Sequence, residues 1–313
     1  MERPAGCVGQ RRLHGTEFVL TEVSVVIPTH ERGSFVREAV QSALTQSENA
    51  EVIVVRSRGD TAAEGLRDHF PRITLLECAG ERGAARNAGC RVAVGVWVLF
   101  LDDDDVLLPG ALSTLVAAAE AHRADVVRGS RVEFDSGVGP PAAPPSATSN
   151  IRRLERDALI IGAEILTPSQ TLFRRAALPD GPFREDFVPV EDYALGATLA
   201  LRGARVMATD ATTTAYRRHA GQTVGYPLNP RALQRRRAVL DELNGHLTHE
   251  RRLRRRARGH HELYARMPTE MSIGRRGRAI VAVLSAAVWS PSLLRHSMWW
   301  RAAAHAAVRG SRA

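Results

Sequence analysis

The stretch Val96-Trp97-Val98-Leu99-Phe100-Leu101-Asp102-Asp103-Asp104-Asp105 places four consecutive carboxylates directly after six apolar residues. A continuous apolar run of this length, ended by a charge cluster, predicts a buried strand. Four like charges beside a buried strand are costly unless a cation or hydrogen bonds compensate them. Mg²⁺ takes oxygen ligands and is often held by one or two carboxylates together with substrate phosphates. A solvated acidic turn is the alternative, but the position at a strand end favours a metal and phosphate site.

Strands and helices are expected to alternate on both sides of this stretch. The β-branched run Val23–Ile27, stopped by Pro28, predicts the first strand. Further strands are expected at 51–55, 73–76 and 96–101, and helices at 34–45 (with Ser34 as a cap), 61–70, 83–94 and 112–121. This alternation predicts an α/β fold with a mostly parallel sheet, in which ligands bind beyond the carboxyl ends of the strands. Pro28, Arg56 and Asp102 fall at such ends.

The pattern is less regular beyond residue 121. Strands are expected at 125–132, 171–173 and 205–208, helices at 152–160 and 190–202, and a Pro/Gly-rich loop at 137–150. From residue 230 onward the sequence is helical and rich in Arg. We therefore expect an N-terminal tail (1–20), an α/β domain (21–230) and a basic, mainly helical extension (231–313).

Charge is unevenly distributed over the 313 residues. The chain has 43 Arg, no Lys and a net charge of +9, and residues 231–313 hold 18 Arg against 5 Asp and Glu. Three cysteines without metal-ligand spacing fit a reducing compartment. The N-terminus has no apolar signal region, and the run Ala279–Trp289 is shorter than a membrane span of about 20 residues. These features predict a cytoplasmic protein.

Five segments together resemble the family-2 glycosyltransferases. They are Val23–Arg32 (VSVVIPTHER), Gly83–Gly89 (GAARNAG), Phe100–Asp105 followed by Pro109, Glu191–Leu195 followed by Leu201-Arg202-Gly203, and Tyr216–His219 (YRRH). Their order and spacing agree with the family pattern over about residues 22–220. The resemblance implies a GT-A, Rossmann-like domain that binds a nucleotide-sugar donor and transfers the sugar, with inversion, to an acceptor hydroxyl.

The resemblance also implies roles for particular residues. Asp104, assisted by Asp102 or Asp103, would hold a divalent cation, Mg²⁺ or Mn²⁺, that stabilises the departing diphosphate. Asp192 would be the base that deprotonates the acceptor, and Glu191 would position it. His219 is a further candidate, for contact with the diphosphate or the metal. Asp105 is expected only to support the turn. The expected donor-binding residues are Pro28, Thr29, His30, Glu31, Asp60, Arg86, Asp102 and Asp103.

One departure concerns the end of the second strand. The family usually has two acids there that contact the base or ribose, whereas this chain has Arg56 and Ser57. Asp60 is a candidate replacement. The departure supports an alternative in which a degenerate transferase domain binds a membrane or a partner. A nucleotidyltransferase is the other alternative, but it needs a Gly-rich loop after the first strand, and Pro28–Glu31 does not provide one.

The basic extension has three interpretations. Arg235–Arg237 and Arg251–Arg258 form dense clusters, and Ile280, Leu284 and Trp299 belong to an apolar set downstream. Basic clusters beside apolar helices suit peripheral contact with an anionic membrane, which would fit a lipid-linked acceptor; a glycan or a small molecule is also open. Alternatively, the helices pack on the first domain and leave their Arg solvated. No recognition motif supports nucleic-acid binding. The resemblance suits cell-envelope or natural-product glycosylation.

Overall fold

The computed structural model describes residues 10–12, 18–20, 22–47, 49–141, 149–219 and 229–290. The chain divides into two compact units, and each is considered by itself. Unit 1 consists of Met1–Leu154, Leu166–Glu185 and Gly203–Ala220, and unit 2 of Glu155–Ile165, Asp186–Arg202 and Gly221–Ala313. The domain boundaries expected from the sequence, at residues 20 and 230, remain predictions.

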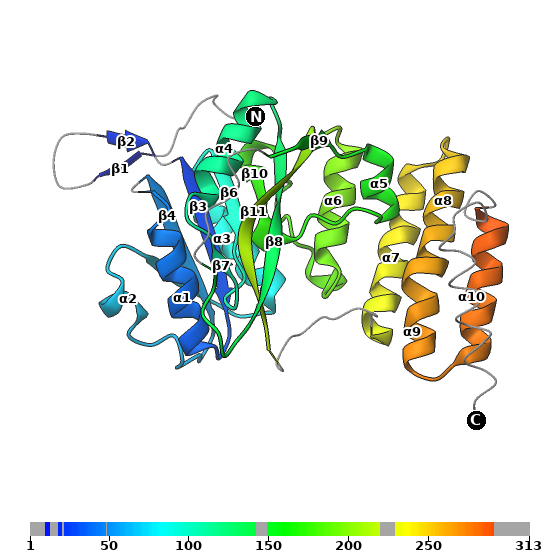
Figure 1. Cartoon of the computed structure of the whole chain (residues 1–313), viewed down its shortest axis with the longest axis horizontal. Helices are drawn as coiled ribbons and strands as arrows, with labels where there is room; N and C mark the ends of the chain where they lie inside the picture. The colour runs from blue at the N-terminus through cyan, green and yellow to red at the C-terminus, as the bar shows by residue number, and fades with distance from the viewer. Residues whose placement is uncertain are drawn as a thin grey trace. The chain divides into compact units, whose positions relative to one another are not determined.

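Unit 1 is built on one mixed sheet (Figure 1), to which nine strands of the described residues belong, in the order β5-β4-β3-β6-β10-β8-β11-β7, with β9 paired to β11. The strands are β3 (Val23–Thr29), β4 (Ala50–Ser57), β5 (Thr74–Cys78), β6 (Trp97–Phe100), β7 (Val106–Leu107), β8 (Val126–Asp135), β9 (Ile151–Arg153), β10 (Thr171–Arg174) and β11 (Val206–Arg218). The short strands β1 (Gln10–Arg12) and β2 (Phe18–Leu20) pair only with each other.

The first half of this sheet is parallel. Strand β3 pairs in parallel with β4 and β6, and β4 with β5. Strand β10 then enters between β6 and β8 and is antiparallel to both. The carboxyl ends of β3, β4 and β6 therefore lie at one edge, which places the loops after Thr29, Ser57 and Phe100 together. The α/β fold expected from the sequence is confirmed.

The helices of unit 1 cover both faces of the sheet. They are α1 (Gly33–Leu44), α2 (Leu66–His69), α3 (Arg82–Val92) and α4 (Ala111–Ala121). Side chains alternate along a strand, and β3 is buried along its whole length. Val25 and Ile27 belong to the core cluster that includes residues of α1 and α4. Val26 points to the opposite face, where α3 packs at Gly89.

Unit 2 is helical in its described part. Its helices are α5 (Arg156–Ile161), α6 (Glu191–Leu201), α7 (Pro230–His246), α8 (Arg251–His261), the π-turn η4 (Glu262–Arg266), α9 (Met267–Ser272) and α10 (Arg276–Trp289). A core cluster joins α6 and α7 through Tyr193, Ala197, Val239 and Leu243. The Tyr193 hydroxyl donates to the Ile160 carbonyl at 2.8 Å, which ties α6 to α5.

Four local expectations were wrong. The first two residues of the helix expected at 152–160 belong to β9, because they pair with β11. The helix expected at 61–70 is reduced to α2, which follows Gly65 with a φ of 73°. Strand β11 is 13 residues long instead of four. Helix α1 begins at Gly33, and no side chain caps it.

Some expectations concern residues outside the described part. The centre of the Pro/Gly-rich loop (142–148) and the apolar residues beyond 290, including Trp299, belong to this group. Among the described helices, none has the length and apolar character needed to cross a membrane. The two described cysteines, Cys78 and Cys90, are free thiols.

Candidate functional site

The acidic turn connects β6 to β7 in unit 1. Its backbone closes through a hydrogen bond from the Asp105 N–H to the Asp102 carbonyl at 3.1 Å. The Asp102 N–H donates to the Ser169 hydroxyl at 3.1 Å, which fixes the start of the turn against the segment before β10. The buried strand therefore delivers the carboxylates to the edge of the sheet, as expected from the sequence.

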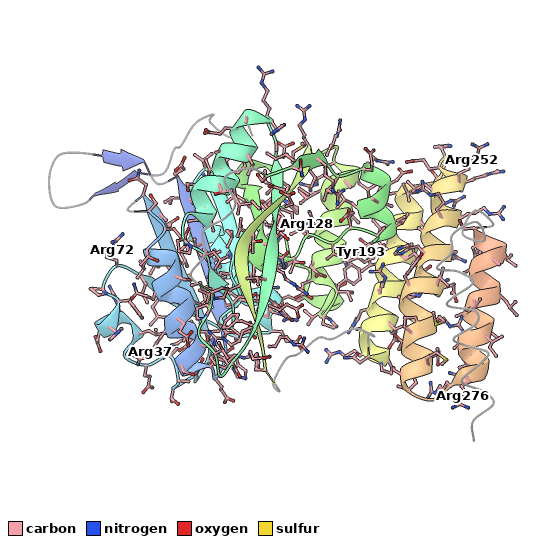
Figure 2. All side chains as sticks on the ribbon, viewed as in Figure 1. Arg37, Arg72, Arg128, Tyr193, Arg252 and Arg276 are labelled. Atoms are coloured by element: carbon pink, nitrogen blue, oxygen red, sulfur yellow. The ribbon has the colours of Figure 1, made fainter. Side chains whose placement is uncertain are left out.

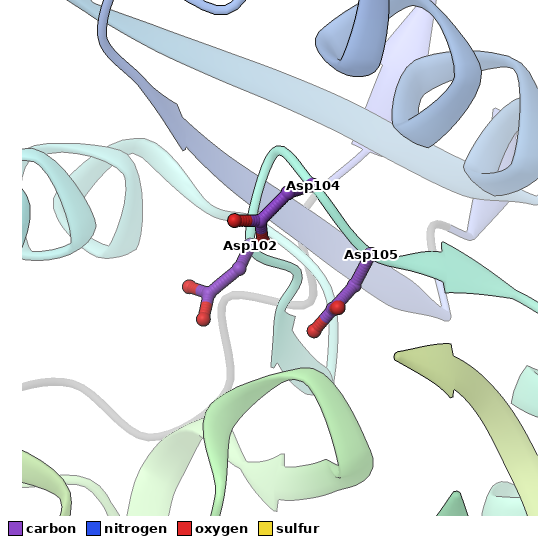
Figure 3. Close-up of side chains that lie close together, drawn as sticks. All are labelled: Asp102, Asp104 and Asp105. Atoms are coloured by element: carbon purple, nitrogen blue, oxygen red, sulfur yellow. The ribbon is translucent and has the colours of Figure 1, made fainter. Parts of the chain in front are cut away.

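Three of the four carboxylates converge (Figure 3). Asp102, Asp104 and Asp105 each offer one oxygen, and these oxygens lie within 4.8 Å of one another. Two oxygens on opposite sides of one Mg²⁺ ion are about 4.2 Å apart, so a small side-chain rotation brings the set into range. An all-oxygen donor set fits a hard divalent cation. Asp105 belongs to this group, although it was expected only to support the turn.

Burial and the neighbouring charges shift the pKa values of these carboxyl groups. Burial, reinforced by Asp102 and Asp104, holds the pKa of Asp105 well above its usual value. Burial also raises the pKa of Asp103 to about 7, and Asp104 adds to the effect. For Asp102, Arg86, Arg82 and Arg32 outweigh the effect of burial and lower the pKa. A cation among these oxygens would relieve the repulsion, so the residues present fit such an ion.

Arg32 and His219 meet at the Asp104 carboxylate. The Arg32 guanidinium donates to Asp104 Oδ2 at 2.6 Å, and His219 Nε2 lies 3.0 Å from the same oxygen. Arg32 Nη1 and His219 Nε2 are also 2.8 Å apart. His219 therefore lies beside one of the predicted metal ligands, and its contact with a metal or a diphosphate remains a prediction. The sequence assigned no role to Arg32; its place directly after the donor-loop segment is the one signal that could have indicated it.

A buried arginine on β11 anchors the same turn. Arg217 Nε donates to the Asp104 carbonyl at 3.0 Å, and its backbone N–H donates to Asp105 Oδ1 at 3.3 Å. The guanidinium lies 4.6 Å from the ring centres of both Phe35 and Phe134. It also donates to Glu38 Oε2 of α1 at 2.6 Å. Sequence reasoning did not assign this function to Arg217.

The Ala-Arg-Asn-x-Gly helix contributes three separate contacts through α3. Arg86, which is 2% exposed, forms an ion pair with Asp102 and lies 5.0 Å from the Phe183 ring centre. The Asn87 side chain donates to the Phe183 carbonyl at 2.7 Å and accepts from its N–H at 2.9 Å. At Gly89 an added Cβ would lie 2.3 Å from Val26 Cγ1, so only glycine lets α3 approach β3. The motif thus orients the Arg86 guanidinium, which faces the acidic turn.

The predicted donor loop follows β3 and is tied to two acids. Pro28 and Thr29 are buried at the end of the strand. The His30 N–H donates to Asp103 Oδ2 at 3.3 Å, which joins the loop to the acidic turn. The Glu31 N–H donates to Asp60 Oδ2 at 3.1 Å.

The end of β4 and the turn after it show what replaces the family acids. Arg56 forms an ion pair with Glu77 at 3.2 Å and donates to the Asp60 carbonyl at 3.3 Å. The second oxygen of Asp60 accepts from the Ala62 N–H at 2.9 Å. Asp60 is 3% exposed, so its carboxylate is largely engaged in holding the two loops together. Its predicted contact with a nucleotide remains a prediction.

Asp192 and Glu191 begin α6 in unit 2. Glu191 is buried, with 3% exposure, whereas Asp192 is partly exposed. Asp192 Oδ1 accepts a hydrogen bond of 2.7 Å from the Tyr193 N–H. Carboxylates in the first turn of a helix are favoured by the helix dipole. This placement is compatible with a base, and it is equally what a helix N-terminus would favour.

A protein-family comparison decides the classification. The model of glycosyl transferase family 2 matches residues 24–181, just over half of the chain. The chain belongs to glycosyl transferase family 2. The matched region contains the acidic turn, α3 and the loops after β3 and β4. Arg217 and His219, which also contact the acidic turn, lie beyond it.

Two bacterial glycosyltransferases are similar to part of the chain. Glycosyltransferase GlyG of Streptococcus pneumoniae is 30% identical over 125 residues, which is 37% of this chain and 41% of that protein. The GalNAc(5)-diNAcBac-PP-undecaprenol beta-1,3-glucosyltransferase of Campylobacter jejuni is 29% identical over 181 residues, or 54% of this chain and 56% of that protein. The chain therefore spans only about half of the length of these relatives.

Solved structures share the architecture of this family-2 member. Staphylococcus aureus TarS 1-349, crystallised in complex with UDP-GlcNAc, has a TM-score of 0.64 at 19% identity. The match covers 86% of this chain and 82% of that chain. At this identity the likeness shows the fold alone. It confirms the GT-A fold with a helical C-terminal region.

Proposed function

We propose that the protein transfers a sugar from a nucleoside-diphosphate donor to an acceptor hydroxyl, with inversion and with a divalent cation. One observation carries the proposal: Asp102, Asp104 and Asp105 converge at the edge of the sheet where β3 ends and the predicted donor loop begins. The family membership supports the reaction class. A structural neighbour crystallised with UDP-GlcNAc supports the donor class.

The residues of unit 1 would act on the diphosphate end of the donor. Asp102, Asp104 and Asp105 would hold Mg²⁺ or Mn²⁺, which would supply charge neutralisation to the departing diphosphate. Arg86 holds Asp102 in place through its ion pair and adds positive charge at the same edge. Arg32 and His219 orient Asp104. The loop from Pro28 to Glu31 would contact the nucleotide.

The acceptor side depends on Asp192. An inverting transfer needs a base that takes the acceptor proton while the bond to the diphosphate breaks on the opposite side. We propose that the Asp192 carboxylate is this base and that the buried Glu191 supports it. In Asp192→Asn, turnover should be lost while donor binding is retained. Asp241→Asn, at an exposed position of unit 2, is the matched control. Full activity of Asp192→Asn would show that the base lies elsewhere.

The acceptor and the site of action belong to the same proposal. We propose an acceptor that is a glycan, a lipid-linked sugar or a small molecule of cell-envelope or natural-product glycosylation. We also propose that the protein acts in the cytoplasm at a membrane surface, which the basic extension supports. We propose no nucleic-acid partner, because no recognition motif accompanies the Arg clusters. The undecaprenol-linked substrate named for the C. jejuni relative supports a lipid-linked acceptor.

A degenerate binding protein is the second candidate, because Arg56 and Asp60 are engaged with each other and with neighbouring groups. Incubation with a panel of nucleotide sugars and Mn²⁺ or Mg²⁺, scored for release of the nucleoside diphosphate, separates the candidates. A transferase releases it from one or a few donors, and release requires the metal. Failure to bind any nucleoside diphosphate in the presence of the metal, measured by calorimetry, would favour the degenerate protein, and pyrophosphate-dependent chemistry would favour a nucleotidyltransferase.

A further inference from the structure

Helix α10 of unit 2 is apolar on two sides. Ala279, Ala282, Val283 and Ala286 are buried against the rest of the unit, with exposures of 4% or less. Four other aliphatic side chains of the helix face outward, and they form the exposed stripe: Ile280 (42%), Val281 (50%), Leu284 (60%) and Val288 (70%). Half of the large exposed aliphatic side chains of the described residues thus belong to this one helix.

The exposed stripe is continuous. At about 100° per residue, its four side chains occupy an arc of about 100° over roughly two turns, opposite the buried side. A helix that is apolar all round is expected either inside a protein or in contact with lipid. Contiguous exposed apolar patches mark surfaces that bind something. The exposed stripe therefore has the character of a surface that binds a partner or a lipid.

The charges around the stripe indicate the kind of occupant. Residues 271–290 contain Arg275, Arg276 and Arg278 and no Asp or Glu. Figure 2 labels Arg276 at the N-terminal end of α10 and Arg252 on α8, and both side chains are exposed. Over residues 229–290 there are 14 Arg and 5 Asp and Glu. An apolar stripe with basic and no acidic flanks is complementary to an anionic, apolar surface.

We propose that the exposed stripe of α10 docks on an anionic lipid bilayer, with its aliphatic side chains inserted and its arginines among the head groups. A second copy of the chain is a poorer occupant, because two such basic faces would repel each other. Crossing the bilayer is excluded for α10, since 14 residues span about 21 Å against an apolar thickness of about 30 Å. The helix lies flat in the interface.

This docking rests on the proposed function only in that it would bring the enzyme to a lipid-linked acceptor. Vesicle binding needs neither donor nor metal, and donor hydrolysis in solution needs no vesicles. Failure of one measurement therefore leaves the other interpretable.

The test is sedimentation of the full chain with vesicles of phosphatidylglycerol and phosphatidylcholine, compared with phosphatidylcholine alone. Leu284→Gln combined with Val288→Gln removes the apolar contact at exposed positions and keeps good helix formers. Val138→Gln is the matched control, because Val138 is 64% exposed and belongs to unit 1. Arg276→Gln combined with Arg278→Gln tests the electrostatic part.

The chain should bind the anionic vesicles, more weakly at high salt, and hardly bind phosphatidylcholine. The double glutamine variant at Leu284 and Val288 should lose about tenfold or more of its affinity, and the Arg276 and Arg278 variant should lose its salt dependence in part. Absence of binding at low salt, or equal binding by the stripe variant and the Val138→Gln control, would overturn the proposal. A dimer that the stripe variant dissociates, measured by light scattering, would show that a second copy is the occupant.

Discussion

Replacing Arg217 with methionine tests how the acidic turn is held. The side chain is 2% exposed and lies between Phe35 and Phe134, with hydrogen bonds to the Asp104 carbonyl and to Glu38. Methionine preserves most of the volume and can contact both rings, but it cannot donate. The variant therefore removes the charge and the donors without leaving a large cavity.

The expected loss follows from the contacts. A hydrogen bond involving a charged group contributes about 1.5–3 kcal/mol, and an unsatisfied buried carbonyl costs about 1–3 kcal/mol. The Glu38 part must be discounted, because that side chain is 45% exposed and returns to water. Cation–π contacts add about 0.5–1 kcal/mol each, partly replaced by sulfur–aromatic contacts. The net expectation is a decrease of about 2–4 kcal/mol in the free energy of unfolding.

Urea unfolding followed by circular dichroism measures this decrease. The neighbour Arg218 is the matched control, because it is 62% exposed and pairs only at the surface with Glu133. Arg218→Met should change the free energy of unfolding by less than about 0.5 kcal/mol. Hydrogen exchange of residues 102–108 should increase in Arg217→Met and stay unchanged in the control. Equal stability of the two variants would refute the assigned function of Arg217.

Two further predictions concern packing and pH. Gly89→Ala should destabilise the protein by about 1–3 kcal/mol, because its Cβ would meet Val26, whereas Gly245→Ala in α7, with open space around it, should be neutral or stabilising in the same thermal unfolding measurement. Burial and the nearby arginines lower the pKa of His261 from 6.5 to about 3, so the unfolded state binds a proton first and stability falls as the pH drops below 6.5. The decrease attributable to His261 is about 2 kcal/mol between pH 6.5 and pH 5, and His261→Gln should remove it from the pH dependence of the urea midpoint; an unchanged pH dependence would contradict the assignment.

The local sequence was sufficient for much of unit 1. Buried parallel strands are near-continuous apolar runs, so β3, β4 and β6 could be recognised directly. Strand β11 was underestimated because residues 209–218 are polar. Three of its threonines, Thr209, Thr213 and Thr214, are buried, and the Thr214 hydroxyl donates to the Ser169 carbonyl at 2.7 Å. A polar residue with an internal partner leaves no apolar periodicity to detect.

Site residues that belong to a contiguous motif were predicted from the sequence. Contacts between residues that are far apart in the sequence were missed. The acidic turn and Arg86 were expected from contiguous motifs. Arg32 reaches Asp104 across 72 positions, and Arg217 reaches the same residue across 113 positions. Such contacts depend on which strands become neighbours, and one sequence does not specify that. The position of Asp105 in the carboxylate group likewise depends on the tight turn closed by its own N–H.

The central claim is that Asp102, Asp104 and Asp105 hold a divalent cation beside a nucleoside diphosphate. Calorimetric titration with a panel of nucleoside diphosphates, in Mn²⁺ and in EDTA, tests it most directly. Asp104→Asn and Asp105→Asn are compared with Asp135→Asn, an exposed control at the end of β8. We predict metal-dependent binding of at least one nucleotide, weakened at least about tenfold in both site variants and unchanged in the control. Equal affinity in Mn²⁺ and EDTA, or site variants that bind as tightly as the control, would contradict the claim.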